Sequence, residues 1–143
     1  METFLVSLRI SNYQQLLENY FKEIGFPDRY TLIDNIQPGD KLVLYIGSGK
    51  SLVAGILEVT SNIYWNNELI WDEFFPKRVT TMPQIILPMN KAVDMRKIKN
   101  GLTFINPDIK KYGSYFMKGV RKLSLQDYEY LKEKILEANN VIR

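Results

Sequence analysis

Neither cysteine nor histidine occurs among the 143 residues of this chain. Disulfide bridges and zinc centres built from Cys and His are therefore excluded as sources of stability, so the chain must fold around a hydrophobic core. The composition allows this, since 45% of the residues are hydrophobic and 24% are charged, as in an ordinary soluble domain. At this length we expect one domain over residues 1–143. The same absence removes thiol nucleophiles and histidine-based acids, bases and triads from its chemistry.

The charge balance and the first residues indicate where such a protein works. The formal net charge is +3, which favours an anionic partner only mildly. Residues 1–10 lack the basic region, apolar run and small-residue cleavage site of a secretory signal. The apolar runs elsewhere are too short to span a bilayer. We therefore expect a cytoplasmic protein without a membrane partner, and nothing in the sequence predicts a cofactor or a metal site.

The first quarter of the chain changes from strand-like to helix-like periodicity. Apolar residues alternate over 4–10, which predicts a strand. Ser11 and Gln14 have the spacing of a capping box, and apolar residues then recur at helical intervals. Gly25 supplies a helix stop, so the pattern predicts a helix over residues 12–24.

Two apolar runs, residues 41–46 and 52–60, predict a β-hairpin. The sequence GSGKS at 47–51 joins them and suggests a phosphate-binding loop. The full pattern would place a glycine at position 44, which is Leu44, so an ordinary turn is the better interpretation. Residues 61–83 are expected to be irregular, and a loop of this length is uncommon unless it has a function.

The second half of the chain carries weaker signals and one strong one. We expect a strand over 84–89, a helical turn over 93–99 and a short extended piece over 102–105. Ser124 and Asp127 form a second capping-box spacing. Apolar residues follow at helical intervals and predict an amphipathic helix ending near Ala138.

Residues 109–126 hold several cations and no acidic side chain. Cations that neutralise phosphates, interleaved with rings on which bases stack, are what single-stranded or unstacked nucleic acid requires. The alternative stays open that the rings belong to the core and the lysines only maintain solubility. The phosphate-binding candidates are Lys110, Lys111, Lys118, Arg121 and Lys122.

Both tryptophans of the chain, Trp65 and Trp71, fall in the long irregular segment. Tryptophan is usually a core residue. In the functional alternative, aromatic rings form a slot for a flat heterocycle, and polar groups beyond strand ends read its edge. Those polar groups are equally explicable as caps or turn residues. The base-pocket candidates are Ser11, Asn12, Ser61, Tyr64, Trp65, Trp71, Tyr115 and Phe116.

Catalysis has little support in the sequence. The carboxylates at 72–73 and 127–129 are of the kind that is common on surfaces, and none is marked as paired with a nucleophile. We therefore predict no catalytic residue. A Lys/Tyr/Glu arrangement that cleaves RNA without metal stays open as the enzyme alternative.

Several segments resemble a known domain family in their order and their residues. They are the strand end Ile10-Ser11-Asn12, the block IQPGDKLVLY at 36–45, the strand VAGILEVTS at 53–61, and RKLSLQDY at 121–128. Together they resemble the EVE domain over almost the whole chain. The hairpin region is the most specific part of this resemblance.

The resemblance implies an α+β, PUA-like fold: a small curved β-barrel with flanking helices, a helix after the first strand and a C-terminal amphipathic helix. It also implies kinship with the YTH readers of methylated adenine, a modified base held in an aromatic pocket, and association with restriction or defence systems. Asn12 and residues 61–64 would lie on the pocket wall, with Phe116 and Arg121 on the facing segment.

This sequence departs from the family pattern in two places. It has no tryptophan in the first strand, and Gln84 stands where many members have a basic residue. Trp65 or Trp71 would then replace the missing ring. We expect a nucleic-acid-binding module that reads a modified base of DNA or RNA beside a basic patch. The alternatives are an RNA-cleaving enzyme of a related PUA-like type and a protein-interaction module.

Overall fold

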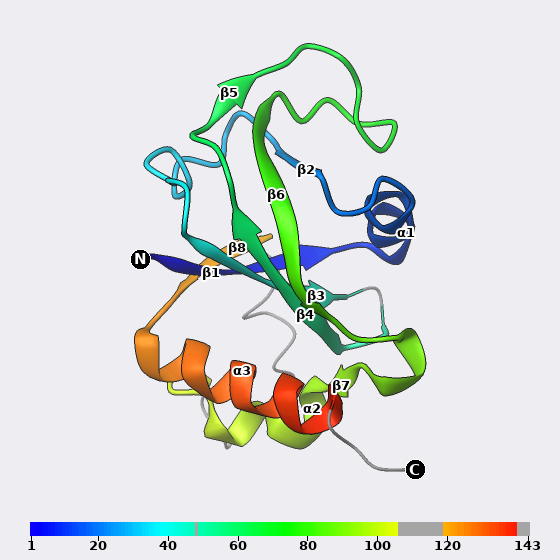
Figure 1. Ribbon diagram of the computed structural model, residues 1–143, viewed down its shortest axis with the longest axis vertical. Coiled ribbons are helices and arrows are strands. Elements are labelled where there is room, and N and C mark those ends of the chain that lie inside the picture. Colours follow the sequence, from blue (N-terminus) through cyan, green and yellow to red (C-terminus); the bar gives the residue numbers. More distant parts are fainter. Residues whose placement is uncertain (48, 106–118, 140–143) are drawn as a thin grey trace.

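A curled sheet with strand order β2-β6-β4-β3-β1-β8 forms the centre of the computed structural model, which describes residues 1–47, 49–105 and 119–139 (Figure 1). Strands β1 and β3 pair in parallel, and the other neighbours are antiparallel. Two short strands join the sheet beside this path, β5 on β6 and β7 on β4. The strands are β1 (Thr3–Leu8), β2 (Glu23–Phe26), β3 (Lys41–Ile46), β4 (Leu52–Val59), β5 (Tyr64–Trp65), β6 (Lys77–Ile86), β7 (Val93–Asp94) and β8 (Val120–Leu123).

The helices cover different parts of this sheet. Helices α2 (Met95–Ile98) and α3 (Leu125–Asn139) lie together against one face, and α1 (Ile10–Glu18) lies at the end of β1 (Figure 1). Short 3-10 turns occupy Met89–Lys91 and Lys99–Gly101. Within the described ranges, no helix is long and apolar enough to cross a membrane.

Both faces of the central strands are buried, which explains their unbroken apolar runs. In β3, Leu42 and Leu44 belong to the cluster inside the curl, together with residues of α1 and β2. Val43 and Tyr45 alternate with them and join the second cluster, where the sheet packs on α3 through residues such as Leu131. The core therefore lies in two layers, one on each side of the sheet.

The curl of the sheet depends on a close approach between β4 and β6. A Cβ atom on Gly55 would lie 2.4 Å from the main-chain oxygen of Ile85. Next to this point the pairing shifts register between Ile56 and Leu57, as at a β-bulge. Bulges bend strands and increase their twist, so the sheet curls here instead of staying flat.

The predicted hairpin and the predicted C-terminal helix are confirmed. β3 and β4 pair antiparallel across the GSGKS segment. Helix α3 begins at the second capping-box spacing, where the Asp127 amide donates to Ser124 Oγ at 3.1 Å. The Asp127 carboxylate does not form the second hydrogen bond of a capping box, which would run from the Ser124 amide. It accepts hydrogen bonds from the amide and hydroxyl of Thr103, at 2.8 and 2.6 Å, and so joins the helix to the segment before it.

The predicted helix over residues 12–24 is wrong at both ends. It begins at Ile10 after Arg9, which provides no side-chain cap, and it ends at Glu18. Tyr20 and Phe21 then take positive φ angles of 57° and 56°, which reverse the chain. Residues 23–26 form β2, so Gly25 lies within a strand and is not a helix stop.

The prediction that residues 61–83 are irregular is also wrong at residues 64–65, which form β5, and from Lys77 onward. β6 already begins at Lys77, and the strand expected over 84–89 is only its last part. Pro83, which argues against a central strand, is tolerated because it lies where the β4–β6 ladder is already interrupted by the register shift. Residues 102–105 form turns and not an extended piece.

Candidate nucleic-acid interface

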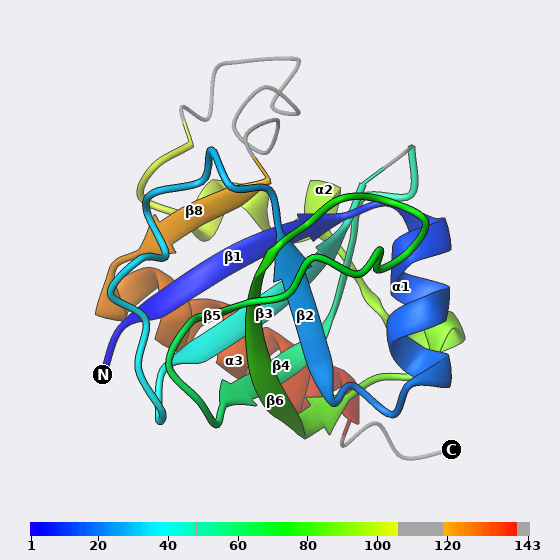
Figure 2. The same cartoon turned by 90° about the horizontal axis from the view of Figure 1, so that it is seen from above.

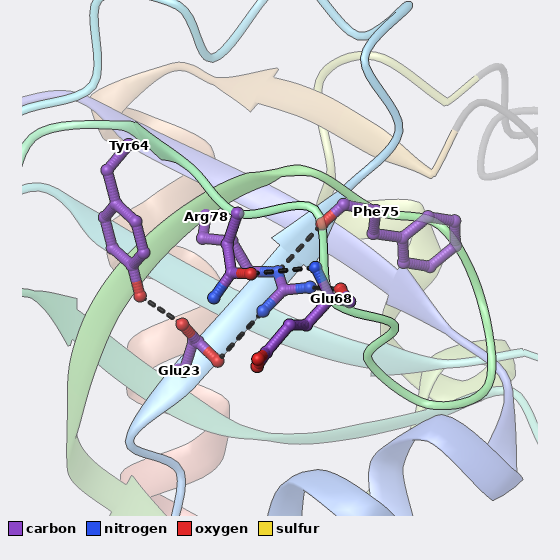
Figure 3. A network of polar contacts seen from close by, with 6 residues as sticks. Glu23, Tyr64, Glu68, Phe75 and Arg78 are labelled. Carbon is purple, nitrogen blue, oxygen red and sulfur yellow. Dashed lines mark hydrogen bonds and ion pairs between the residues drawn. The ribbon is translucent and has the colours of Figure 1, made fainter.

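One buried arginine holds the segment between β5 and β6 in place. We call residues 64–76 the aromatic loop. Arg78, which is 2% exposed, donates from Nε to the main-chain oxygen of Phe75 at 2.9 Å, and from Nη2 to that of Glu68 (Figure 3). Its Nη1 lies 3.4 Å from Oε1 of Glu23 on β2. The Arg78 guanidinium therefore holds both ends of residues 68–75 in place. Its positive charge is balanced by the Glu23 carboxylate.

Tyr64 belongs to the same network. Its hydroxyl donates a hydrogen bond to the second carboxylate oxygen of Glu23 (Figure 3). Burial of the phenol, followed by this hydrogen bond, raises the pKa of Tyr64 to about 12. The phenol is therefore neutral at physiological pH and acts as a hydrogen-bond donor that ties the start of the aromatic loop to β2.

The aromatic loop lies close to β2 because position 25 carries no side chain. A Cβ atom on Gly25 would lie 2.8 Å from Cγ2 of Ile70 and 3.1 Å from Cβ of Phe75. Figure 2 shows the connection from β5 to β6 running across β2 towards α1. The glycine that suggested a helix stop in the sequence is thus a packing site for the loop.

The two indoles have different environments. Trp71 is 8% exposed, belongs to the core and meets Phe75 edge to face with ring centroids 5.9 Å apart. Trp65 is 56% exposed and meets the equally accessible Phe74 edge to face at 6.3 Å. The Trp65 indole nitrogen donates to Asn67, so its polar group is already satisfied. Trp65 is therefore the indole whose face a ligand can reach.

A tight turn in the aromatic loop brings it to the start of α1. Ile70 and Glu73 exchange two main-chain hydrogen bonds, and the residues between them, Trp71 and Asp72, have φ angles of 55° and 61°. Two successive positive φ values are typical of a type I′ turn, which normally uses Asn or Gly. Side chains as large as Trp are rarely found in this conformation. The surrounding contacts stabilise this turn against that cost.

The turn delivers a carboxylate to α1. Oε2 of Glu73 accepts a hydrogen bond of 3.0 Å from Nδ2 of Asn12, a residue that is only 7% exposed. Oε1 of Glu73 lies 3.6 Å from Nη1 of Arg9, whose side chain is largely in solvent. The structure thus brings together the α1 and loop segments that the sequence singled out separately.

The other candidates have varied positions. Ser11 is exposed on α1. Ser61 Oγ accepts from the Thr80 amide at 2.9 Å and donates to the Asn62 carbonyl, so it closes the turn after β4. Arg121 on β8 stacks on Phe104, 4.4 Å from the ring centroid, and Lys122 pairs with Glu2 at 2.8 Å. Lys110, Lys111, Tyr115, Phe116 and Lys118 lie outside the described residues.

Sequence reasoning missed the residues that organise this region. Arg78 and Glu23 carried no signal, because the first lay in a segment expected to be irregular and the second in a segment expected to be helical. In the sequence, Glu73 resembles an ordinary surface acid. In the part of the chain that the structure describes, no three acidic residues come together as a metal site would require. The region offers aromatic faces and hydrogen-bonding groups, the chemistry of binding a flat polar ligand.

No protein-family model matches the sequence. The UPF0310 protein PH1033 of Pyrococcus horikoshii is 28% identical over 127 residues, and the match covers 78% of this chain and 85% of that protein. Human THYN1, solved in complex with DNA containing 5-methylcytosine, superimposes with a TM-score of 0.61 over 94% of this chain and 98% of its own, at 10% identity. The YTH domain of Zygosaccharomyces rouxii MRB1, solved with N6-methyladenosine RNA, gives 0.61 over 99% and 88%, at 12% identity.

The chain has the PUA-like α+β fold. This confirms the fold class implied by the resemblance to EVE domains. At such low identities the likeness to the solved structures concerns the fold alone, so membership of the EVE family stays a prediction.

Proposed function

We propose that this chain is a nucleic-acid-binding module that reads a modified base of DNA or RNA where the aromatic loop meets the start of α1. The observation that carries the proposal is the hydrogen bond of 3.0 Å between Asn12 and Glu73, which joins a largely buried amide to a loop rich in aromatic side chains. Two proteins of the same fold, THYN1 and the MRB1 YTH domain, were solved with methylated DNA and methylated RNA. Their ligands support a base as the occupant.

In this proposal, rings and polar groups have separate roles. Trp65 supplies an exposed face for stacking, with Tyr115 and Phe116 as the predicted opposing rings, and Ser11 and Asn12 read the edge of the base. Stacking on an aromatic side chain contributes roughly 1–3 kcal/mol per base. The base must be unpaired or flipped out of its helix, so poorly paired and single-stranded sites are favoured.

The cations act before the base is read. Lys110, Lys111, Lys118, Arg121 and Lys122 would attract the phosphate backbone without regard to sequence. An additional methyl group on the base adds contact area within a slot. Discrimination from one such group is modest, about 1–3 kcal/mol, unless the wrong base leaves a polar group unpaired.

A binding screen tests the proposal directly. Labelled DNA and RNA oligonucleotides carrying cytosine, 5-methylcytosine, 5-hydroxymethylcytosine, adenine or N6-methyladenine are titrated at two salt concentrations, with chelator present. We expect one modified base to bind more tightly than its unmodified parent, and the oligonucleotide to be recovered intact. Cleaved RNA would favour the enzyme alternative instead. Failure to bind any oligonucleotide at low salt would leave the protein-interaction alternative.

A pair of variants separates base reading from general attraction. Trp65→Ala removes the exposed indole and should reduce the preference for the modified base. Tyr20→Ala removes a ring that is 74% exposed at the far end of α1 and serves as the matched control. Equal effects of both substitutions on every oligonucleotide would contradict a base slot at the aromatic loop.

A further inference from the structure

The Asn12 amide has a fixed polarity because of the group that faces it. An asparagine amide presents an acceptor oxygen on one side and a donor nitrogen on the other, and a half turn about its last torsion exchanges the two. Glu73 faces it with a carboxylate, which only accepts hydrogen bonds when ionised. The NH₂ group must therefore point to Glu73, as the 3.0 Å contact between Nδ2 and Oε2 requires.

The amide oxygen of Asn12 remains for another donor. Within the described residues, the side chain makes its hydrogen bond through Nδ2 alone, and no buried side-chain nitrogen or oxygen lacks a partner. The oxygen is therefore not sealed inside the protein, although the residue as a whole is 7% exposed. A group approaching the start of α1 meets an acceptor whose orientation is already set.

Glu73 is itself held rigidly. It closes the two-hydrogen-bond turn with Ile70, and Trp71 within that turn is anchored in the core. Arg78 fixes Phe75 and Glu68 on either side. The carboxylate therefore approaches Asn12 from a preorganised loop, so little ordering entropy is lost when a ligand binds.

We propose that Glu73 is a positioning residue that makes the site select bases with an amino group on the edge facing Asn12. The inference rests on the proposed function and deepens it. Adenine and cytosine carry such donors, whereas guanine and thymine present a carbonyl oxygen at the corresponding positions. An amino group that bears one methyl keeps one N–H and remains acceptable. A carbonyl would face the Asn12 oxygen and leave both acceptors unpaired.

The test compares bases that differ by amino against carbonyl, together with the adjoining ring nitrogen, which accepts in the amino member and donates in the carbonyl member. The probes are single-stranded DNA with one 5-methylcytosine or one thymine, which share the methyl group, and a second pair with one adenine or one hypoxanthine. The site is expected to accept bases from one of the two pairs. Within that pair, we expect the wild-type protein to bind the base with the amino group about tenfold more tightly than the base with the carbonyl.

Glu73→Gln retains a hydrogen-bonding side chain but allows either polarity, because glutamine both donates and accepts. The amino-to-carbonyl ratio should then fall to roughly one to threefold. Glu73→Asp keeps the charge but shortens the reach, and should reduce the ratio in the same way. Glu68→Gln removes the same charge from an exposed position of the same loop and should keep the wild-type ratio.

The outcomes separate this inference from the proposed function. Tight binding with an unchanged ratio in both Glu73 variants, or a wild-type preference for the carbonyl member, would overturn the inference while the reader function stands. Absence of binding to these four probes and to every oligonucleotide of the binding screen would overturn both. Circular dichroism melting of each variant shows whether a changed ratio comes from a folded protein.

Discussion

Nε of Arg78 donates to the main-chain oxygen of Phe75 at 2.9 Å, from a side chain that is almost completely buried. The same guanidinium reaches the main chain at Glu68 and the carboxylate of Glu23. A planar group with five donors in fixed directions suits three acceptors that converge from a strand and two points of a loop. The conformation of the aromatic loop therefore depends on one side chain of β6.

We expect Arg78→Lys to destabilise the protein by about 2–4 kcal/mol, because an ammonium cannot reach all three acceptors and buried groups lose their partner. Urea unfolding measures the change. Arg96→Lys is the matched control, since Arg96 is largely exposed beside Asp94 and surface ion pairs contribute at most about 1 kcal/mol. Similar losses in both variants would contradict the organising role of Arg78.

The raised pKa of Tyr64 predicts a dependence of stability on alkaline pH. The phenol has a pKa of about 10 in the unfolded chain and about 12 in the folded protein. Between these values the folded state retains a proton that the unfolded state has released, so stability is lost as pH rises from 10 through 12. The difference in unfolding free energy between wild type and Tyr64→Phe should therefore be constant below pH 10. Above pH 10 the wild type should lose stability relative to Tyr64→Phe, which has no phenol to ionise.

Gly25→Ala tests the close approach of the aromatic loop to β2. The added methyl would overlap Ile70, so the loop must move, and we expect a loss of about 1–3 kcal/mol. Gly47→Ala is the control, because the nearest atom to a Cβ at that position, on Tyr45, lies 3.9 Å away. Differential scanning calorimetry compares the two. An unchanged melting temperature for Gly25→Ala would contradict the packing.

The two tryptophans should differ in both accessibility and energetic role. Acrylamide should quench the fluorescence of Trp65 and leave that of Trp71 largely unaffected, as shown by measuring Trp65→Phe and Trp71→Phe separately. Trp71→Ala should cost about 3–5 kcal/mol of stability through lost core packing. Trp65→Ala should change stability by less than about 0.5 kcal/mol. Equal quenching of the two would be inconsistent with the described burial.

The predicted phosphate contacts are tested through salt. Replacing Lys110, Lys111 and Lys118 with alanine should weaken all oligonucleotides alike and reduce the slope of log K against log salt by roughly one for each phosphate contact removed. Lys97→Ala is the control, because this exposed lysine lies on α2, away from the aromatic loop in Figure 1. A triple variant with an unchanged slope would remove these lysines from the interface.

The elements with local signals could be predicted from the sequence. β3 and β4 combine apolar runs with a glycine-rich turn, and α3 combines a serine cap with helical periodicity. β2 could not be predicted in this way, because Tyr20, Phe21 and Ile24 continue the helical spacing of the apolar residues of α1. The chain reverses before β2 through positive φ angles at Tyr20 and Phe21. Neither position carries Gly or Asn, the residues that usually mark such a turn in a sequence.

The candidate site was predicted in its parts but not in its connections. Asn12 and the aromatic loop were singled out, yet their contact depends on Glu73, which lies 61 residues from Asn12 in the sequence. Arg78 and Glu23 pair across 55 residues. Such pairs follow from the tertiary arrangement, and a single sequence carries no periodic signal for them.

The position of β1 constrains how the protein can be made. It lies between β3 and β8, and its Thr3 hydroxyl donates to the main-chain oxygen of Leu123, 120 residues later. During translation one side of the first strand stays without its neighbour until residue 123 has emerged from the ribosome. The nascent chain therefore presents an open sheet edge while the 120 residues between these partners are made, the kind of surface that chaperones shield from aggregation.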